Sequence, residues 1–314
     1  MTVVAQEQNA RHSSVWTTRS GLGIGRIRAI VTTVTIKAGR GKPACRPAAH
    51  MNSTATLLDA AHHQLALGVY AYELEQLPWR EMPRGTAHEK CVRQDDAAGL
   101  YLGLIRFDPL SRSGVHQHLG TATSFFLSGS LTDYQGTTGE GHVGINLAGA
   151  THDAVSYTGA LLVSRLEGPV IIPDGGLAVH PYAAPAVLRA SNVETPPDIA
   201  VRLDQALATP TRFAGVVRRT LFDYAGTGHD RRLCALTMWP KAPPVRVKHT
   251  AATDFFLLAG DLRVDGKITS GPAFILIEPD TEISLSSEYG CQLLAWAEGP
   301  ARCPRSNFEL YGFG

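Results

Sequence analysis

The chain has 314 residues, and its 29 Lys and Arg nearly balance its 28 Asp and Glu, which gives a formal net charge of +1. This balance argues against a basic surface that binds nucleic acid or membranes. The sequence also contains no run of about 18 apolar residues, which is the length needed to cross a bilayer. The 31 Gly and 19 Pro, with many short β-branched and aromatic runs, predict an all-β protein, long enough for two domains.

Residues 1–50 differ in composition from the rest, because they are rich in Arg, Ser and Thr and poor in acidic residues. Two interpretations are open: a transit peptide, or sequence translated ahead of a true start at Met51. We favour the second. In either case we expect a leader that is disordered or absent from the mature protein and lies outside the fold.

From residue 100 onward, short apolar or alternating runs are separated by turns rich in Gly, Thr, Asp and Ser, which predicts a sandwich or a closed barrel. The predicted strands are Leu100–Phe107, Val115–His118, Ser124–Ser128, Leu131–Tyr134, Val143–Leu147, His152–Ser156 and Leu161–Leu166. A Pro-rich passage between Thr195 and Pro210 leads to a second unit. We place one domain at residues 51–200 and the other at 201–314.

A His-x-His sequence in the first domain is the strongest functional signal. Residues two apart on a strand share a face, so His116 and His118 point to one interior site. His152 follows 34 residues later, in a turn that leads into another strand. An isolated His-x-His is more often a packed or exposed polar pair, but the third histidine favours three ligands to one metal ion, in a domain that we expect to be a barrel.

A constant offset of 131 residues aligns the two halves of the chain without a gap. The matching positions are Pro109 and Pro240, His118 and His249, Phe125 and Phe256, Gly129 and Gly260, Glu167 and Glu298, and Pro169 and Pro300. The Glu-Gly-Pro sequences recur in both halves, so we predict that they are structural and end the last strand of each unit.

The second unit lacks most of the candidate ligands. At the same offset, Val247 replaces His116 and Ile283 replaces His152, so only His249 remains. We therefore predict no metal site in this half. A weak site formed by His249 and Asp254 is the alternative.

These residues resemble the two motifs of the cupin family. The first motif corresponds to Gly114, His116, His118, Thr123 and Gly129, and the second to Gly141, Leu147, Gly149 and His152. The resemblance covers about residues 70 to 303 and implies two tandem cupin barrels, which are double-stranded β-helices or jelly-rolls. Thr123 stands where many cupins have a glutamate ligand, and Leu147 stands in place of a proline.

The missing glutamate has a chemical consequence. Three neutral imidazoles leave a divalent ion its full double charge, which favours an anionic bidentate substrate such as an enolate. The three histidines, the His118-Leu119-Gly120 sequence and the stretch Leu104–Pro109 resemble the 2,4'-dihydroxyacetophenone and acetylacetone-cleaving dioxygenases. This resemblance implies Fe(II), O2 and oxidative cleavage of a carbon–carbon bond in a diketone or aryl hydroxyketone.

Two other functions are open. One is an isomerase or hydrolase that uses Zn, Mn or Ni as a Lewis acid. The other is a non-catalytic sensor, similar to the cupin halves of zinc-binding anti-sigma factors. We rank the sensor last because the early histidines and cysteine lack the closely spaced ligand pattern of those proteins; they are His12, Cys45, His50, His62 and His63.

Three further residues are candidates for the substrate pocket. Strand parity predicts that Thr123 and Phe125 face the interior near the metal, and Ser156 lies four residues after His152 on the same predicted strand face. Phe125 is better explained as a core residue, whereas Ser156 is explained equally well as a pocket residue or as a small core residue. We predict no catalytic residue beyond the metal ligands.

The cysteines indicate the compartment. They are odd in number, widely spaced and form no Cys-x-x-Cys pair, as expected for incidental thiols in a reducing cytoplasm. They are Cys45, Cys91, Cys234, Cys291 and Cys303. Because resembling proteins often associate through barrel edges, we also consider a homodimer. The other expected partners are a small-molecule substrate and O2.

Overall fold

The computed structural model describes residues 56–57, 62–82, 87–171, 198–225 and 227–312, which all belong to one compact unit, Met51–Gly314. The prediction for residues 1–50 lies outside the described residues. Every regular element in the described ranges is a β-strand, except for the 3-10 turn η1 (Leu74–Gln76), so the predicted all-β class is confirmed. None of these elements is a helix that could span a membrane.

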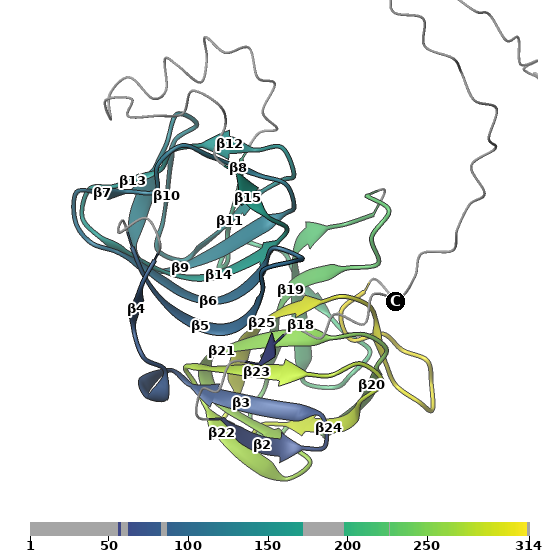
Figure 1. Cartoon of the computed structure of the whole chain (residues 1–314). Helices are drawn as coiled ribbons and strands as arrows, with labels where there is room; N and C mark the ends of the chain where they lie inside the picture. The colour runs from purple at the N-terminus through teal and green to yellow at the C-terminus, as the bar shows by residue number, and fades with distance from the viewer. Residues whose placement is uncertain (1–55, 58–61, 83–86, 172–197, 226, 313–314) are drawn as a thin grey trace, which may run out of the picture. The chain divides into compact units, whose positions relative to one another are not determined.

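The strands form two barrels: in Figure 1 the first is mainly blue to teal, and the second is mainly green to yellow with β2 and β3 in purple-blue. Strands that pair within the first barrel are β1 (Thr56–Leu57), β4 (Arg80–Glu81), β5 (His88–Asp95), β6 (Leu100–Phe107), β7 (Ser111–Arg112), β8 (His116–His118), β9 (Ala122–Thr132), β10 (Thr137–Gly139), β11 (His142–Asn146), β12 (Thr151–His152), β13 (Val155–Ser156), β14 (Ala160–Glu167), β15 (Val170–Ile171) and β16 (Ile199–Arg202). The main sheet has the order β1-β5-β6-β14-β9-β11-β16, and the short sheet β12-β8-β15 carries the His-x-His sequence.

The second barrel repeats this plan. Its strands are β2 (His63–Ala66), β3 (Val69–Glu73), β17 (Ala208–Pro210), β18 (Val216–Asp223), β19 (Arg232–Met238), β20 (Val245–His249), β21 (Thr253–Val264), β22 (Lys267–Ser270), β23 (Ala273–Ile277), β24 (Glu282–Ser286), β25 (Cys291–Ala297) and β26 (Ala301–Arg302). The main sheet has the order β17-β18-β19-β25-β21-β23-β3-β2. The two halves are therefore tandem β-barrels, as predicted from the repeat.

The strand pairing corrects one domain boundary. The hairpin β2–β3 comes before the first barrel in the sequence, but β3 pairs with β23 of the second barrel. Val69 and Ala71 are fully buried there, so the second barrel takes part of its core from the start of the chain. At the other end of the first barrel, β16 follows the linker in sequence and pairs with β11, so it completes the sheet of the first barrel. Residues 63–73 thus belong to the second barrel and not to the predicted domain 51–200.

The 131-residue repeat extends to the backbone of the long central strands. A bulge interrupts the pairing of β9 with β14, and an equivalent bulge interrupts that of β21 with β25. Just after each bulge, Gly129 and Gly260 have positive φ angles of 68° and 85°. A Cβ on either residue would lie 1.9 Å from a carbonyl oxygen, that of Gly159 or Gly290. Only glycine fits these positions, and the predicted break after Ser128 is a bend within one strand.

The barrels pack on each other through equivalent faces. The indole Nε1 of Trp296 donates a hydrogen bond to Thr123 Oγ1 at 2.7 Å, and Arg165 Nε donates to Asp254 Oδ2 at 3.2 Å. Thr123 matches Asp254 in the repeat, and Arg165 matches Trp296. The contact therefore has the reciprocal form of a two-fold interface, made within a single chain.

Two glutamates complete this interface. Glu167 and Glu298 both pair with the buried Arg165, and both also pair with Arg231, at 2.8 Å and 2.7 Å. The recurring Glu-Gly-Pro sequences are therefore structural, as predicted. They place two carboxylates where the ends of β14 and β25 meet.

Candidate metal centre

Three imidazoles converge at one end of the first barrel. His116 and His118 project from the same face of β8, and β12 places His152 directly opposite His116 in the strand register. The Nε2 atom of His152 lies 3.0 Å from Nε2 of His116 and 3.2 Å from Nε2 of His118. Ligands at right angles around an ion with metal–nitrogen distances of ~2.1 Å lie ~3.0 Å apart, so three neutral nitrogens at these separations fit one divalent ion. The structure thus brings the three predicted ligands together.

Backbone and carboxylate groups hold two of these rings from behind. His116 Nδ1 lies 2.7 Å from the carbonyl oxygen of Gly114, and His152 Nδ1 lies 3.1 Å from Asp133 Oδ2. A proton on each Nδ1 satisfies these bonds and leaves the Nε2 lone pair directed to the common site. Such outer partners fix the tautomer and orientation of metal-binding histidines.

His118 is the most buried of the three ligands, with 6% of its surface exposed. Burial, together with the neighbouring His116 and His152, lowers the pKa of His118 to about 2. The ring is therefore neutral at physiological pH, as a metal-binding imidazole must be.

A carboxylate pair adjoins His152, and the sequence analysis missed it. Asp133 follows β9 in a tight turn, where its Oδ1 accepts hydrogen bonds from the backbone N–H groups of Gln135 and Gly136. Asp198 lies against Asp133, and burial followed by this contact raises the pKa of Asp198 to about 6. The signal for Asp133 was an Asp-x-x-Gly turn one residue after a strand. Asp198 offered no such signal, since it lies 46 residues beyond His152.

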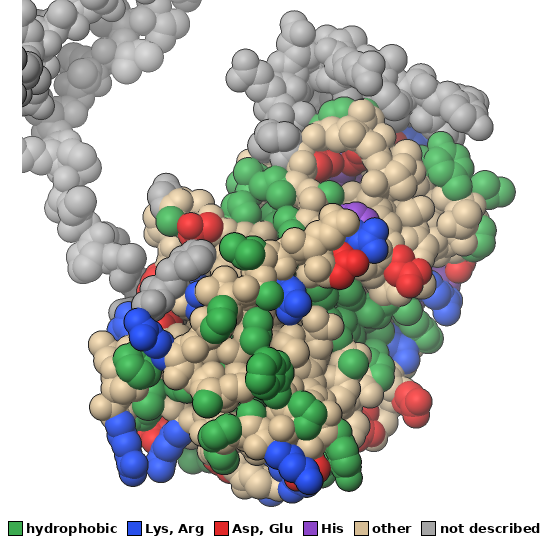
Figure 2. Space-filling model, turned by 180° about the vertical axis from the view of Figure 1, so that it is seen from behind, with side chains coloured by type: hydrophobic (Ala, Val, Ile, Leu, Met, Phe, Trp, Pro, Cys, Tyr) green, Lys and Arg blue, Asp and Glu red, His purple; other side chains and the backbone are tan. Residues whose placement is uncertain are grey.

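The histidines open onto a cavity of about 460 Å³ inside the first barrel. On the face shown in Figure 2, a hollow in this barrel holds acidic and histidine side chains. Its walls are largely apolar, and no Lys or Arg occurs among the described residues that line it. The apolar lining comprises Met82, Ala87, Ile105, Phe107, Ala122, Phe126, Leu131, Ile145, Ala154, Leu162, Leu166, Val170, Ile199 and Ala200.

Two predicted pocket residues face away from the cavity. Thr123 bonds to Trp296 and Phe125 belongs to the apolar cluster between the barrels, whereas Ser124 and Phe126 line the cavity. The prediction was wrong because parity counted from His118 does not continue through the turn that precedes β9. Ala122, the residue before Thr123, lines the cavity, and the described lining contains no glutamate.

Ser156 is also not among the cavity-lining residues. The predicted strand His152–Ser156 is in fact two short strands, β12 and β13, which pair with different partners. His152 and Ser156 therefore lie on separate strands, and the alternation counted from His152 does not carry over to Ser156. The hydroxyl of Ser156 donates to the carbonyl oxygen of Ser130 at 3.0 Å, which is a structural role.

The second barrel does not assemble the alternative site. His249 is fully buried beside Thr253 and Tyr311, whereas Asp254 points to Arg93 and Arg165 at the barrel interface. His249 contacts Thr253, and Thr253 and Asp254 are successive residues of β21 that face opposite sides of the sheet, so Asp254 points away from His249. Val247 and Ile283 occupy the other two positions within a closed apolar core.

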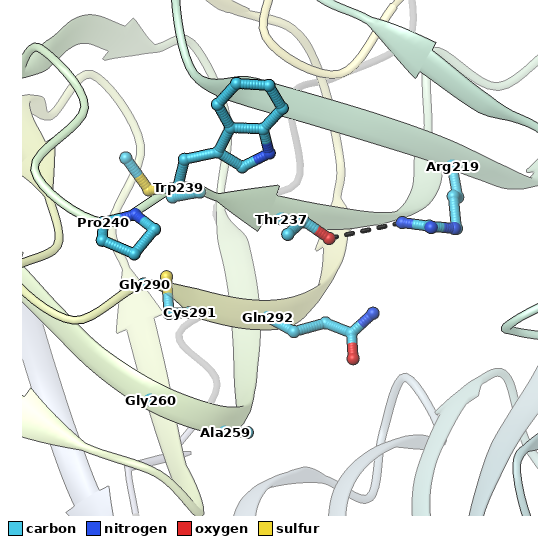
Figure 3. A pocket seen from close by; sticks show the side chains of 10 residues that line it. Arg219, Thr237, Trp239, Pro240, Ala259, Gly260, Gly290, Cys291 and Gln292 are labelled. Carbon is cyan, nitrogen blue, oxygen red and sulfur yellow. Dashed lines mark hydrogen bonds between the residues drawn. The ribbon is translucent and has the colours of Figure 1, made fainter.

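A second hollow, of about 440 Å³, lies on the second barrel around Trp239 (Figure 3). Arg219 Nη1 donates to Thr237 Oγ1 at 3.3 Å along its wall. Burial raises the pKa of the Cys291 thiol to about 11, so it is not a reactive thiolate. The described lining contains no histidine or carboxylate, and we assign no chemistry to it.

Comparison with known proteins agrees with this architecture. Residues 68–169 match the model of the ChrR cupin-like domain. A comparison with curated proteins gave no match.

Solved structures share the fold over about three quarters of the chain. A proposed dioxygenase from Nostoc punctiforme is 11% identical with a TM-score of 0.57, over 78% of this chain and 87% of that one. A structure of oxalate decarboxylase is 13% identical with a TM-score of 0.50, over 73% of this chain and 77% of that one. At these identities the likeness concerns the fold alone, which is two tandem cupin jelly-rolls.

Proposed function

We propose that the protein is a mononuclear non-haem Fe(II) dioxygenase that cleaves a carbon–carbon bond of a diketone or an aryl hydroxyketone. The observation that carries the proposal is the convergence of three imidazoles, without a carboxylate ligand, on a largely apolar cavity. When bound, the divalent ion would supply positive charge for an enolate and redox chemistry for O2.

The chain's own residues define what this cavity accepts. His116, His118 and His152 would hold the ion, and Asp133 orients His152. Because the described lining has no Lys or Arg, a substrate with a separate carboxylate would find no cationic side chain to pair with. An uncharged ketone that acquires charge only next to the ion fits this lining better. The apolar walls would exclude water from the reacting carbon atoms.

The experiment combines metal analysis with oxygen uptake. Protein purified anaerobically with Fe(II) should hold about one iron per chain and consume O2 with acetylacetone or an aryl hydroxyketone. The His118→Ala variant should lose both properties. His249→Gln, at the matching position of the second barrel, should keep both.

Two outcomes would contradict the proposal. Turnover without O2 and with Zn, Mn or Ni would indicate an isomerase or hydrolase. Tightly bound zinc without turnover of any such substrate would indicate a non-catalytic metal-binding protein.

A further inference from the structure

The two barrels differ at one equivalent place on the outer faces of their main sheets. Arg106 on β6 and Thr237 on β19 match at the 131-residue offset, and both alternate with residues that face a barrel interior. In the first barrel, the indole of Trp79 covers this place, with its ring centroid 4.6 Å from the guanidinium carbon of Arg106. In the second barrel, Thr237 instead lines the hollow around Trp239 (Figure 3).

Both barrels keep a basic residue beside this place. Lys90 on β5 lies opposite Leu104 in register, and Arg219 on β18 lies opposite Ala235. Because Leu104 and Ala235 match at the 131-residue offset, Lys90 and Arg219 occupy equivalent positions. Lys90 Nζ lies 5.1 Å from the ring centroid of Trp79, so in the first barrel this one indole covers two cationic side chains.

The second barrel lacks the indole because a small residue stands in its place. β4 pairs with β5 and starts directly after Trp79, so extending its register by one residue places Trp79 opposite Lys90. The corresponding strand is β17, which pairs with β18 and starts at Ala208, opposite Arg219. Ala208 therefore occupies the position of Trp79. A methyl group replaces the indole, which leaves Arg219 and Thr237 without this cover.

The uncovered guanidinium also lacks an acidic partner. Arg219 Nη1 donates to Thr237 Oγ1 at 3.3 Å, but none of the described carboxylates forms an ion pair with Arg219. Its Nε is shielded from solvent and has no hydrogen-bond partner among the same residues. Arg106 of the first barrel, in contrast, pairs with Asp108. Because guanidinium groups bind carboxylates through paired N–H donors, the hollow is suited to an anion at this end.

The rest of the hollow suits an aromatic ring next to that anion. Trp239 forms one wall and is 60% exposed, so its indole is available for stacking. Gln292, opposite Thr237 in register, lies toward the Arg219 end in Figure 3, and its amide makes no hydrogen bond within the described part of the chain. The hollow thus combines cationic and amide donors at one end with an exposed aromatic face.

We propose that this hollow binds an aromatic carboxylate. The ring takes the place that Trp79 occupies in the first barrel, and the carboxylate pairs with Arg219 and accepts a hydrogen bond from the Gln292 amide. A volume of about 440 Å³ is in the range of small-molecule sites. The inference is independent of the proposed function, because the hollow lies on the second barrel and requires neither metal nor O2.

The first test compares two probes of the same shape that differ in charge. Calorimetry of the metal-free full-length protein, in which the three histidines hold no ion for a carboxylate to bind, should show indole-3-carboxylate binding about tenfold tighter than indole-3-carboxamide, as expected for a hydrogen bond to a charged group. Arg219→Gln should abolish this preference. Arg246→Gln removes an arginine of the same barrel that already pairs with Glu282, and it should preserve the preference.

The second test restores the cover that the repeat predicts. Ala208→Trp places an indole beside Arg219, as Trp79 lies beside Lys90, so it should fill the hollow and abolish the binding of both probes. Leu207→Trp is the matched control, because Leu207 is 83% exposed and precedes β17. This variant should bind both probes as the wild-type protein does.

Four outcomes would overturn the inference. They are equal binding of the acid and the amide by the wild-type protein, a preference for the acid that persists in Arg219→Gln, binding that persists in Ala208→Trp, and binding that is lost in Leu207→Trp. Sedimentation covers one further case. A dimer that Ala208→Trp converts to a monomer would show that a second copy of the chain fills the hollow, which also overturns the inference.

Discussion

Two imidazoles of the candidate metal centre are oriented by contacts to their Nδ1 atoms, on the side of the ring away from the shared site. Asp133 is the clearest case, because one of its oxygens is held by two backbone N–H groups and the other meets Nδ1 of His152. The turn after β9 thereby fixes a carboxylate behind a ligand from β12. Asp133 acts as a positioning residue, since it reaches the site through His152.

Replacing this carboxylate should weaken metal binding without unfolding the protein. Asp133→Asn removes the charge that supports the Nδ1 proton of His152, so we expect the affinity for Co(II) to fall about 10- to 100-fold. Competition with a chromophoric chelator measures this change. Asp204→Asn, which breaks an exposed pair with Arg202, is the control and should leave the affinity unchanged. Equal affinities for the two variants would show that Asp133 does not position the ligand.

Strand geometry decides which side chains reach the cavity. In β9, Ser124 and Phe126 line the cavity before the bulge. Leu131 and, directly after the strand, Asp133 line it afterwards, so the bulge changes the inward-facing positions from even to odd. Without the extra residue, Asp133 would face the opposite side of the sheet. The bulge therefore places Asp133 where it can orient the ring of His152.

The glycine that follows the bulge should be intolerant of substitution. Gly129→Ala introduces a side chain at a positive φ and 1.9 Å from a backbone oxygen, so we expect the free energy of unfolding to fall by about 3 kcal/mol or more. Urea denaturation measures this loss. Gly144→Ala is the control, because its Cβ would meet no heavy atom closer than 3.6 Å. Similar stabilities for the two variants would refute the steric argument.

The two barrels depend on each other for stability. They exchange strands, bury a common apolar cluster and share the pseudo-two-fold contact in which Arg165 meets acidic residues of both halves. A buried guanidinium requires such partners, because an unpaired charge in the interior is strongly destabilising. The second barrel therefore supports the fold of the first.

The barrel interface should make stability fall at acid pH. Burial alone would raise the pKa of Glu298, but Arg165 and Arg231 outweigh it and lower this pKa from 4.5 to about 2. The carboxylate therefore stabilises the folded state above pH 4.5, and this contribution is lost as the pH falls toward 2; it amounts to at most about 3 kcal/mol.

Urea denaturation between pH 2 and 7 tests this dependence. Glu298→Gln should lower stability at neutral pH and flatten the decline below pH 4.5. Glu282→Gln, which breaks an exposed pair with Arg246, should retain the decline. A decline of the same size in Glu298→Gln would exclude Glu298 as its source.

The sequence alone predicted the features that depend on local patterns. Alternation and turn residues indicated strands, the 131-residue offset indicated two equal barrels, and the spacing of His116, His118 and His152 indicated three convergent rings. These features follow from the two-residue period of a strand and from the conformational freedom of glycine, both of which are readable along the chain.

Only the tertiary structure decided which residues surround those rings. Thr123 and Phe125 face the other barrel because parity does not pass through a turn, and Ser156 faces away because β12 and β13 pair with different strands. The contact between Asp133 and Asp198 joins segments 65 residues apart, and β3 enters the second barrel from the start of the chain. Such contacts arise from long-range strand pairing, whose register depends on the whole buried surface and not on any local stretch of sequence.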